Sequence, residues 1–185
     1  MVQKVEPIKS KVIISEIKKS LSDHPRNFAL FVCGINFGFR GGDLLNIKVE
    51  QVKDLKVGDD FEVKEQKTKK FRRITLNQNC FDAIQNLLNH TNFDDGSYLF
   101  QSQRAEKLTV NSLCRLVKMW TGKYKSLKGN YGSHTLRKTF GYHKRLQGTD
   151  IPTLMIMFNH STQKQTLIYL CIQDDEIKNV YMDNI

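Results

Sequence analysis

The sequence predicts an α+β fold: a single, mainly helical domain that carries one small antiparallel β-hairpin. The chain has 185 residues, 39% of them hydrophobic, which is enough to bury one ordinary core. Several stretches place apolar residues at helical spacing. One basic stretch, residues 61–76, instead contains two short strand-like runs around a turn. We therefore expect one domain over residues 1–185.

The first part of the chain is expected to form two helices and the start of a third. Residues 10–21 mix apolar residues with Lys and Glu at the spacing of an amphipathic helix. Pro25 suits the first turn of the next helix, which is apolar nearly all round and breaks at residues 36–38. This helix is expected at the centre of the core. A short helix is expected to begin at Arg40.

The middle of the chain has a different character. Residues 61–67 and 71–76 are expected to form the strands of a basic hairpin, with a turn at residues 68–70. Two further amphipathic helices are expected at residues 80–88 and 108–120.

The charge balance points to a polyanionic partner. The chain has 29 Lys and Arg residues against 19 Asp and Glu residues, a net charge of +10. This excess is larger than solubility requires, and it favours nucleic acid over a membrane surface as the partner. Charge alone does not distinguish DNA from RNA.

Cysteine usage and hydropathy suggest a cytoplasmic protein. The four cysteines are scattered without a C-x-x-C pair, so neither a zinc site nor a disulfide framework is expected. The N-terminal residues have no apolar core of a signal peptide, and no apolar run approaches the length of a membrane span. We expect a soluble protein in a reducing cytoplasm.

Four side chains near the C-terminal end could meet at one phosphate. His134 and Arg137 are three positions apart and would share one face of a helix. His160 follows a second apolar helix, residues 151–158, and Tyr169 lies nine positions further on. An arginine can hold two phosphate oxygens while a phenol attacks. Since no acidic metal ligand lies among these residues, the set suits phosphoryl chemistry without a metal or other cofactor.

These residues resemble the C-terminal motifs of the tyrosine recombinase (phage integrase) family. The family pattern is H-x-x-R, a hydrophobic helix, a histidine in a small polar turn, and a nucleophilic tyrosine about nine residues later. His134-Thr-Leu-Arg137, His160 and Tyr169 match this order. The segment Gly38-Phe-Arg40-Gly-Gly-Asp43-Leu likewise resembles the family's first-arginine motif, G-x-R-x-x-[E/D]-L.

The resemblance implies a role for each matching residue. Tyr169 would be the nucleophile, and Asp43 would hold the guanidinium of Arg40 in position. A hairpin lysine acts as general acid in the family, and Lys67 matches it in a K-T-x-K setting. The implied catalytic groups are Arg40, Lys67, His134, Arg137, His160 and Tyr169, with Asp43 in support.

The remaining basic residues of the hairpin and of the helix after Arg137 are candidates for DNA contacts. They are Lys64, Lys69, Lys70, Arg72, Arg73 and Lys138. Basic side chains in such a strip can bind phosphates along a DNA backbone. Of these, Lys64, Lys69 or Lys70 could also replace Lys67 as the general acid. A solvated sheet edge is the competing interpretation of the strip.

The resemblance also implies the partners and the domain organisation. The fold would be the DNA breaking–rejoining fold, and the substrate would be double-stranded DNA. The N-terminal core-binding domain typical of the family is expected to be absent. The tail, about residues 172–185, carries more acidic than basic residues and could form a short helix. In family assemblies such a tail is often donated to a neighbouring subunit, which implies self-association on DNA. A self-packed or frayed terminus is the alternative.

Other functions remain open from the sequence. A type IB topoisomerase would nick and reseal DNA with similar groups. A non-catalytic DNA-binding module would need the charge but no reactive tyrosine. A metal-dependent nuclease would use carboxylates such as Asp43, Asp59 and Asp60, which lack a convergent spacing.

Overall fold

The structure is a computed structural model, and it describes residues 5–170 together with Met182. The chain divides into two compact units, Met1–Phe140 and Gly141–Ile185, and each is described by itself. The single domain expected over residues 1–185 stays a prediction. The tail helix expected within residues 172–185 falls outside the described residues, apart from Met182.

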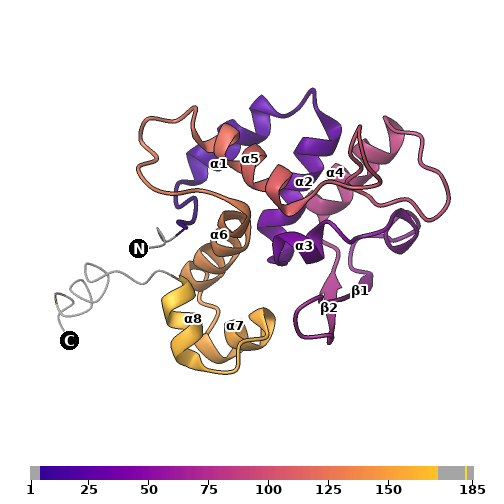
Figure 1. The fold of residues 1–185 in the computed structure, drawn as a ribbon. Helices are drawn as coiled ribbons and strands as arrows, with labels where there is room; N and C mark the ends of the chain where they lie inside the picture. The colour runs from indigo at the N-terminus through magenta and orange to yellow at the C-terminus, as the bar shows by residue number, and fades with distance from the viewer. Residues whose placement is uncertain (1–4, 171–181, 183–185) are drawn as a thin grey trace. The chain divides into compact units, whose positions relative to one another are not determined.

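The described elements are mostly helices, with one two-stranded antiparallel sheet (Figure 1). This confirms the predicted α+β class. In the first unit the elements are α1 (Lys11–Ser20), α2 (Pro25–Phe37), α3 (Gly41–Leu44), the 3₁₀ turn η1 (Val49–Gln51), β1 (Asp60–Lys64), β2 (Phe71–Thr75), α4 (Gln78–Asn89), α5 (Val110–Thr121) and the beginning of α6 (Ser133–Leu146). The second unit contains the end of α6, then α7 (Ile151–Phe158) and α8 (Gln163–Leu170).

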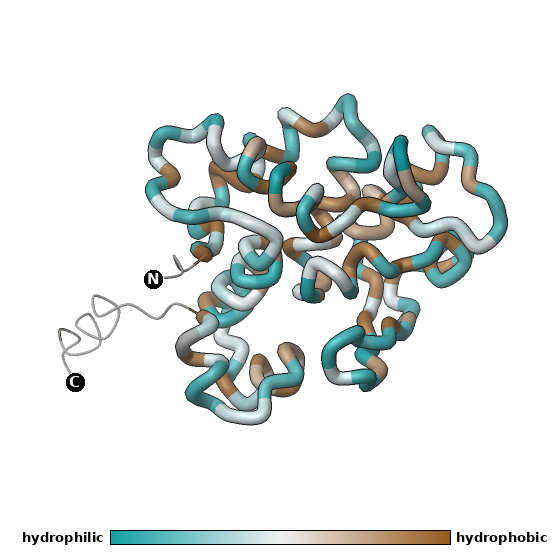
Figure 2. Tube along the Cα trace, in the orientation of Figure 1, coloured by the Kyte–Doolittle hydropathy of each residue, from teal (hydrophilic) through white to brown (hydrophobic). Residues whose placement is uncertain are grey.

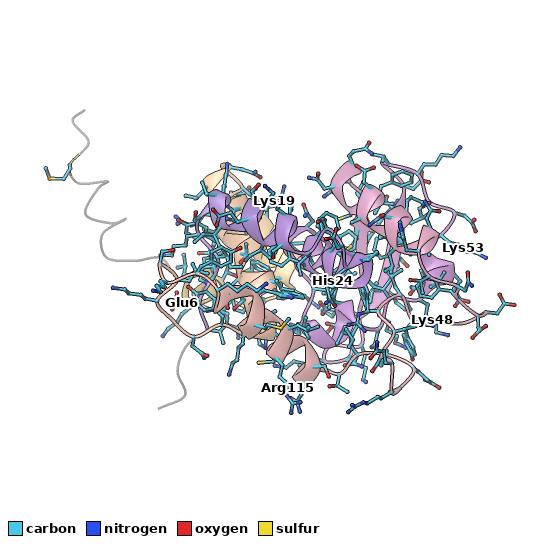
Figure 3. The ribbon with its side chains drawn as sticks, turned by 90° about the horizontal axis from the view of Figure 1, so that it is seen from above. Glu6, Lys19, His24, Lys48, Lys53 and Arg115 are labelled. Carbon is cyan, nitrogen blue, oxygen red and sulfur yellow. The ribbon has the colours of Figure 1, made fainter. Side chains whose placement is uncertain are left out.

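Helix α2 is the centre of the core, as its all-round apolar sequence predicts. Residues 29–33 of this helix are at most 1% exposed. It packs against α4 and also contacts α1 and α3. Figure 2 shows hydrophobic residues concentrated along the inner segments of this unit and hydrophilic residues in its outer loops. Charged side chains such as Lys19, Lys53 and Arg115 lie at its periphery (Figure 3).

The helix ends follow the expected capping chemistry. The hydroxyl of Ser10 accepts a hydrogen bond from the Ile13 N–H and so caps α1, and Pro25 occupies the first turn of α2. Helix α2 ends at Gly38, whose φ of +61° lies in the left-handed region. A Cβ atom at Gly38 would come within 2.4 Å of the Phe140 ring. Glycine at this position therefore satisfies both the backbone conformation and the packing.

The hairpin is shorter than its sequence suggests. Strands β1 and β2 pair in antiparallel register, with Phe61 opposite Ile74 and Val63 opposite Arg72. The expectation that the first strand extends to residue 67 is wrong, because residues 65–70 form the turn. The Glu65 N–H donates to the Lys70 carbonyl, and the Lys69 N–H donates to the Glu65 carbonyl.

The second unit holds a tight helical corner. Asn159 ends α7 in the left-handed conformation, at φ +52°, and α8 begins four residues later. Gly141 on α6 lies so close to Phe158 and Leu170 that a Cβ atom would come within 2.5 Å of the Phe158 ring and 2.9 Å of Leu170. The apolar faces of α7 and α8 are buried at Leu154 and Phe158 and at Leu170.

We predict that Gly38→Ala lowers the free energy of unfolding by about 2–4 kcal/mol. An L-residue in the left-handed region costs about 1 kcal/mol, and the clash with Phe140 adds an overpacking cost of about 1–3 kcal/mol. Gly96→Ala is the matched control, because Gly96 also has a positive φ but has nothing within 4 Å of a Cβ position. Urea denaturation measures both variants. Equal losses in the two variants would contradict the packing part of the argument.

Candidate active site

Two arginines bind the C-terminal end of α2. The guanidinium of Arg72 donates to the carbonyls of Phe37 and Gly38, at 2.6 and 2.9 Å. The guanidinium of Arg137 donates to the same Gly38 carbonyl at 3.0 Å. The last carbonyls of a helix lack partners within the helix and carry its partial negative charge. Arg72 from β2 and Arg137 from α6 are therefore held side by side at one helix end.

Helix α6 positions Arg137 and His134. The Thr135 hydroxyl accepts a hydrogen bond from the Gly132 N–H at 3.0 Å, which fixes the start of the helix. The Thr139 hydroxyl donates to the Thr135 carbonyl and accepts from the Ile8 N–H. Arg137 is 1% exposed, so the surrounding protein fixes the position of its guanidinium. His134 lies about one turn earlier with an exposed side chain.

Arg40 lies just before α3 and pairs with two carboxylates. Its Nη1 atom is 3.0 Å from the Oε2 atom of Glu65 and 3.9 Å from the Oδ2 atom of Asp43. Asp43 makes its short contact elsewhere, because its Oδ1 atom accepts a hydrogen bond from the Gln66 N–H at 2.8 Å. The sequence therefore identified a carboxylate near Arg40, but Glu65 is the closer partner.

The turn that carries Lys67 is attached to the same carboxylates. The Thr68 hydroxyl donates a hydrogen bond to the Oε2 atom of Glu65 at 2.7 Å, and the Gln66 N–H donates one to the Oδ1 atom of Asp43. Lys67 itself is exposed. Its charge reaches His134 and contributes to lowering the pKa of that imidazole.

These residues form one electrostatic group, which we call the cationic cluster. Its members are Arg40, Lys67, Arg72, His134, Arg137 and Lys138, together with the carboxylates Asp43 and Glu65. With His134 neutral, five cationic side chains face two carboxylates in this group, an excess of three positive charges. Such an excess favours an anionic ligand.

Burial and, after it, repulsion between cations lower the pKa of Arg72. Burial is the largest cause that lowers this pKa, and the charges of Arg137 and Arg40 lower it further, against Glu65 and Asp43, which raise it. The resulting pKa is about 9, so the guanidinium is still charged at neutral pH.

The pKa of His134 is lowered from its ordinary value. Partial desolvation by the surrounding protein is the largest cause that lowers this pKa, although part of the His134 side chain is accessible to solvent. Repulsion by Arg137 and then by Lys138, Arg40 and Lys67 lowers the pKa further. His134 is therefore neutral at pH 7 and able to accept a proton.

The candidate DNA-contacting residues fall into two groups. Lys64, Lys69 and Lys70 are exposed on the hairpin, and so is Arg73, whose guanidinium pairs with Asp60 at 2.6 Å. Two other candidates lie differently from what the sequence suggests. Arg72 is engaged with backbone carbonyls, and Lys138 is 6% exposed. Their positions suit a role inside the cationic cluster better than a surface contact.

In the second unit, His160 and Tyr169 come together. Their ring centroids are 5.3 Å apart, with the planes at 72°. The Phe158 ring lies 5.3 Å from each of them, and the Nδ1 atom of His160 is 3.0 Å from the Thr166 hydroxyl. The left-handed residue Asn159 turns the chain between α7 and His160. The prediction that this pair meets the cationic cluster at one phosphate stays a prediction.

The sequence carries a signal for the inward orientation of two members of the cluster, Glu65 and Arg72. Phe61, Val63 and Glu65 alternate along one strand direction and share a buried face. On the partner strand Arg72 and Ile74 share the inward face, since each pairs with a buried residue. A charged residue in a buried phase of a strand indicates an internal partner.

Three further observations concern the described part of the chain. It has no group of three or more His, Cys, Asp or Glu side chains that could hold a metal ion. Cys33, Cys80 and Cys114 are free thiols. Among the helices described, each is too short or too polar to cross a membrane.

Comparison with known proteins establishes the family. The model of the phage integrase family matches residues 8–176. The chain belongs to this family. Tyrosine recombinases, as its members are also called, are metal-independent DNA strand-transfer enzymes that use a tyrosine nucleophile.

Two relatives match more than nine tenths of this chain but differ in their own length. The probable integrase/recombinase YoeC of Bacillus subtilis (strain 168) is 33% identical over 182 residues, which cover 96% of this chain and 95% of YoeC. The tyrosine recombinase XerC of Caldanaerobacter subterraneus subsp. tengcongensis is 30% identical over 184 residues, covering 92% of this chain. This match takes up 50% of XerC, so the chain spans about half the length of that relative.

The fold has a solved counterpart with bound DNA. The crystal structure of the XerH site-specific recombinase, in a pre-cleavage complex with its difH substrate, superposes with a TM-score of 0.73 at 17% identity. The match covers 96% of this chain and 55% of XerH. The chain therefore has the fold of this DNA-bound recombinase.

We predict that Arg72→Met lowers the free energy of unfolding by about 2 kcal/mol, because the Phe37 and Gly38 carbonyls each lose a charged donor, although Gly38 keeps its bond from Arg137. Relief of repulsion with Arg40 and Arg137 offsets only part of this loss. Arg73→Met is the matched control on the same strand. Arg73 is 71% exposed in its side chain, so solvent screens its ion pair with Asp60 and the pair contributes little to stability. Urea denaturation compares the two, and an Arg72 variant as stable as the control would contradict the structural role.

Proposed function

We propose that this chain is the catalytic domain of a site-specific DNA recombinase, which cuts and rejoins double-stranded DNA through a 3′-phosphotyrosyl intermediate. The observation that carries the proposal is the cationic cluster, in which Arg40 and Arg137 come from segments nearly a hundred residues apart and act on the same neighbours. Family membership supplies the reaction type, and the cluster suggests which residues bind the phosphate.

Arg40 and Arg137 bind the two non-bridging oxygens of the scissile phosphate. Charge grows on these oxygens in the transition state, and fixed donors that stabilise it are usually the largest catalytic contribution. The hydrogen bond to Gly38 and the ion pair with Glu65 fix the two guanidiniums before DNA arrives. A guanidinium has five N–H donors, so contacts with the protein are compatible with phosphate binding.

Tyr169 attacks the phosphorus atom, and its proton leaves during attack because the ordinary pKa of a phenol is about 10. His134 accepts this proton, since its lowered pKa keeps it neutral. His160, adjacent to Tyr169, donates a hydrogen bond to the same phosphate. Lys67 protonates the leaving O5′ atom, which a long flexible ammonium side chain on a turn can reach.

The phosphotyrosyl bond keeps the energy of the cleaved phosphodiester. A 5′ hydroxyl from a different strand can attack it and restore the DNA without ATP. The exposed residues Lys64, Lys69 and Lys70 contact the DNA backbone beside the scissile phosphate.

We also propose that the protein self-associates on DNA by exchange of the tail, and that it is located in the cytoplasm. The DNA-bound XerH structure and the net charge of +10 support the choice of DNA as partner.

The proposal predicts a covalent protein–DNA adduct formed in the presence of EDTA. The probe is a pool of duplexes with a randomised central segment and one nick, so that a cleaved short strand diffuses away and the adduct accumulates. Denaturing gels detect the adduct, mass spectrometry maps the modified residue, and sequencing of the captured DNA gives the target. We expect the adduct on Tyr169.

Two variants control this experiment. Tyr169→Phe should abolish the adduct, reducing it by at least about a thousandfold, because phenylalanine has no nucleophile. Tyr142→Phe, on the nearby helix α6, should leave it unchanged. Cleavage that needs a divalent cation, or an adduct that persists in Tyr169→Phe, would overturn the proposal in favour of a nuclease or another nucleophile.

The lowered pKa of His134 predicts the acidic limb of the pH profile. The base is active when neutral, so the second-order rate constant for adduct formation should fall only below pH 6.5, as the imidazole becomes protonated. An ordinary histidine, with a pKa of about 6.5, would already be half protonated there. Single-turnover cleavage from pH 5 to 8 measures this limb. The limb should disappear in His134→Gln, and a limb centred above pH 6.5 would contradict the assignment.

A further inference from the structure

Glu65 is a buried carboxylate at the junction of β1 and the Lys67 turn. It is 0% exposed, and its Oε2 atom lies 3.0 Å from the Nη1 atom of Arg40. The same oxygen accepts the hydrogen bond of the Thr68 hydroxyl at 2.7 Å. One carboxylate oxygen therefore contacts both the phosphate-binding arginine and the turn that carries Lys67.

Stability alone is a weak explanation for this arrangement. Removing a carboxylate from water is costly, and a buried ion pair often contributes no more than an apolar pair of the same size. On β1 the neighbouring acid Glu62 is exposed, so the hairpin tolerates acids at its surface. The position of Glu65 instead matches a geometric requirement between two functional groups.

Contacts on both sides of Lys67 lead back to Arg40. Before Lys67, the Gln66 N–H donates to Asp43, which lies 3.9 Å from Arg40. After Lys67, Thr68 donates to Glu65, which pairs with Arg40 directly. The residues on both sides of Lys67 are thus held in place, while Lys67 itself is exposed.

We propose that Glu65 is a positioning residue that couples leaving-group protonation to phosphate binding. It fixes the Lys67 turn relative to the guanidinium of Arg40, so that a phosphate bound by Arg40 places its O5′ atom within reach of the lysine. This inference rests on the proposed function, because it assigns the general acid to Lys67 and phosphate binding to Arg40.

Replacing the bridging 5′ oxygen by sulfur separates the two roles. In the normal step the phenol oxygen of Tyr169 bonds to phosphorus, the P–O5′ bond breaks, and O5′ takes its electron pair and a proton from Lys67. In the sulfur substrate the P–S bond breaks and a thiolate leaves. A thiol has a pKa of about 8.5, so the thiolate needs no general acid. The probe is the duplex captured by the adduct experiment, with oxygen or sulfur at the cleaved position.

Glu65→Gln keeps the size of the side chain and removes its charge. We expect single-turnover cleavage of the oxygen substrate to fall by about 10–100-fold, as is typical for residues that orient an active group. The loss on the sulfur substrate should be at least threefold smaller. The inference would be overturned if the loss of rate on the oxygen substrate were less than three times the loss on the sulfur substrate, because Glu65 would then act through Arg40 alone. It would also be overturned if the rate on the oxygen substrate did not fall, because Glu65 would then have no role in cleavage. Glu62→Gln is the matched control and should cleave both substrates at the wild-type rate.

Lys67→Ala distinguishes failure of this inference from failure of the proposed function. If the sulfur substrate rescues Lys67→Ala but not Glu65→Gln, only the inference fails. If it does not rescue Lys67→Ala, the role of the lysine is wrong and the inference fails with it.

Thr68→Val tests the same link without removing a buried charge. This variant keeps the ion pair of Arg40 with Glu65 and removes the hydroxyl that donates to Glu65. It keeps the test decisive if Glu65→Gln does not fold, which circular dichroism would show. We expect Thr68→Val to cleave the oxygen substrate more slowly than the wild type and to cleave the sulfur substrate at the wild-type rate. Equal effects on the two substrates would overturn the inference.

Discussion

The end of helix α2 is the constraint on which the rest of the cationic cluster depends. A buried helix end must find donors for its last carbonyls, since water cannot reach them. Here the donors are the guanidiniums of Arg72 and Arg137, which share the Gly38 carbonyl. Because backbone atoms hold these cations, their positions do not depend on flexible surface contacts. The structural need of one helix thus places positive charge in the interior.

This arrangement carries a cost that an anionic ligand would relieve. Burial, and after it repulsion by Arg137 and Arg40, lowers the pKa of Arg72 to about 9. The helix dipole and the carboxylates Asp43 and Glu65 offset part of the repulsion. A phosphate bound among these groups would add the missing negative charge, so binding and stability are linked. A strained cluster of this kind is typical of a functional site.

Local signals explain which parts of the fold the sequence could predict. The periodicity of α1 and α2, Pro25 in the first turn of α2, and the stop at Gly38 all depend on neighbouring residues, so the boundaries of these helices were predicted closely. The strand ending was not, because the hydrogen bonds of Glu65 across the hairpin, and not β propensity, end β1 at Lys64. Tertiary contacts decide such endings.

In the candidate site, sequence motifs identify some residues, whereas the position of Arg72 depends on how the two strands pair. The sequence indicated Arg40, His134 and Arg137 through motif order, and the structure brings them into one electrostatic group. It did not indicate that Arg72 is an internal residue. A cation in a basic hairpin looks like its exposed neighbours unless the strand register is known. Only the pairing of Val63 with Arg72 shows which of the two adjacent arginines faces inward.

The choice of acid near Arg40 follows from side-chain length. An aspartate three residues after the arginine reaches the Gln66 N–H at 2.8 Å but leaves its other oxygen 3.9 Å from the guanidinium. That distance is too long for a strong charge-assisted hydrogen bond. The longer Glu65 approaches from the hairpin and closes to 3.0 Å. The two carboxylates therefore have different roles. Asp43 holds the backbone of the Lys67 turn, and Glu65 pairs with Arg40. Their contacts connect the hairpin to helix α3, which is separate from it in sequence.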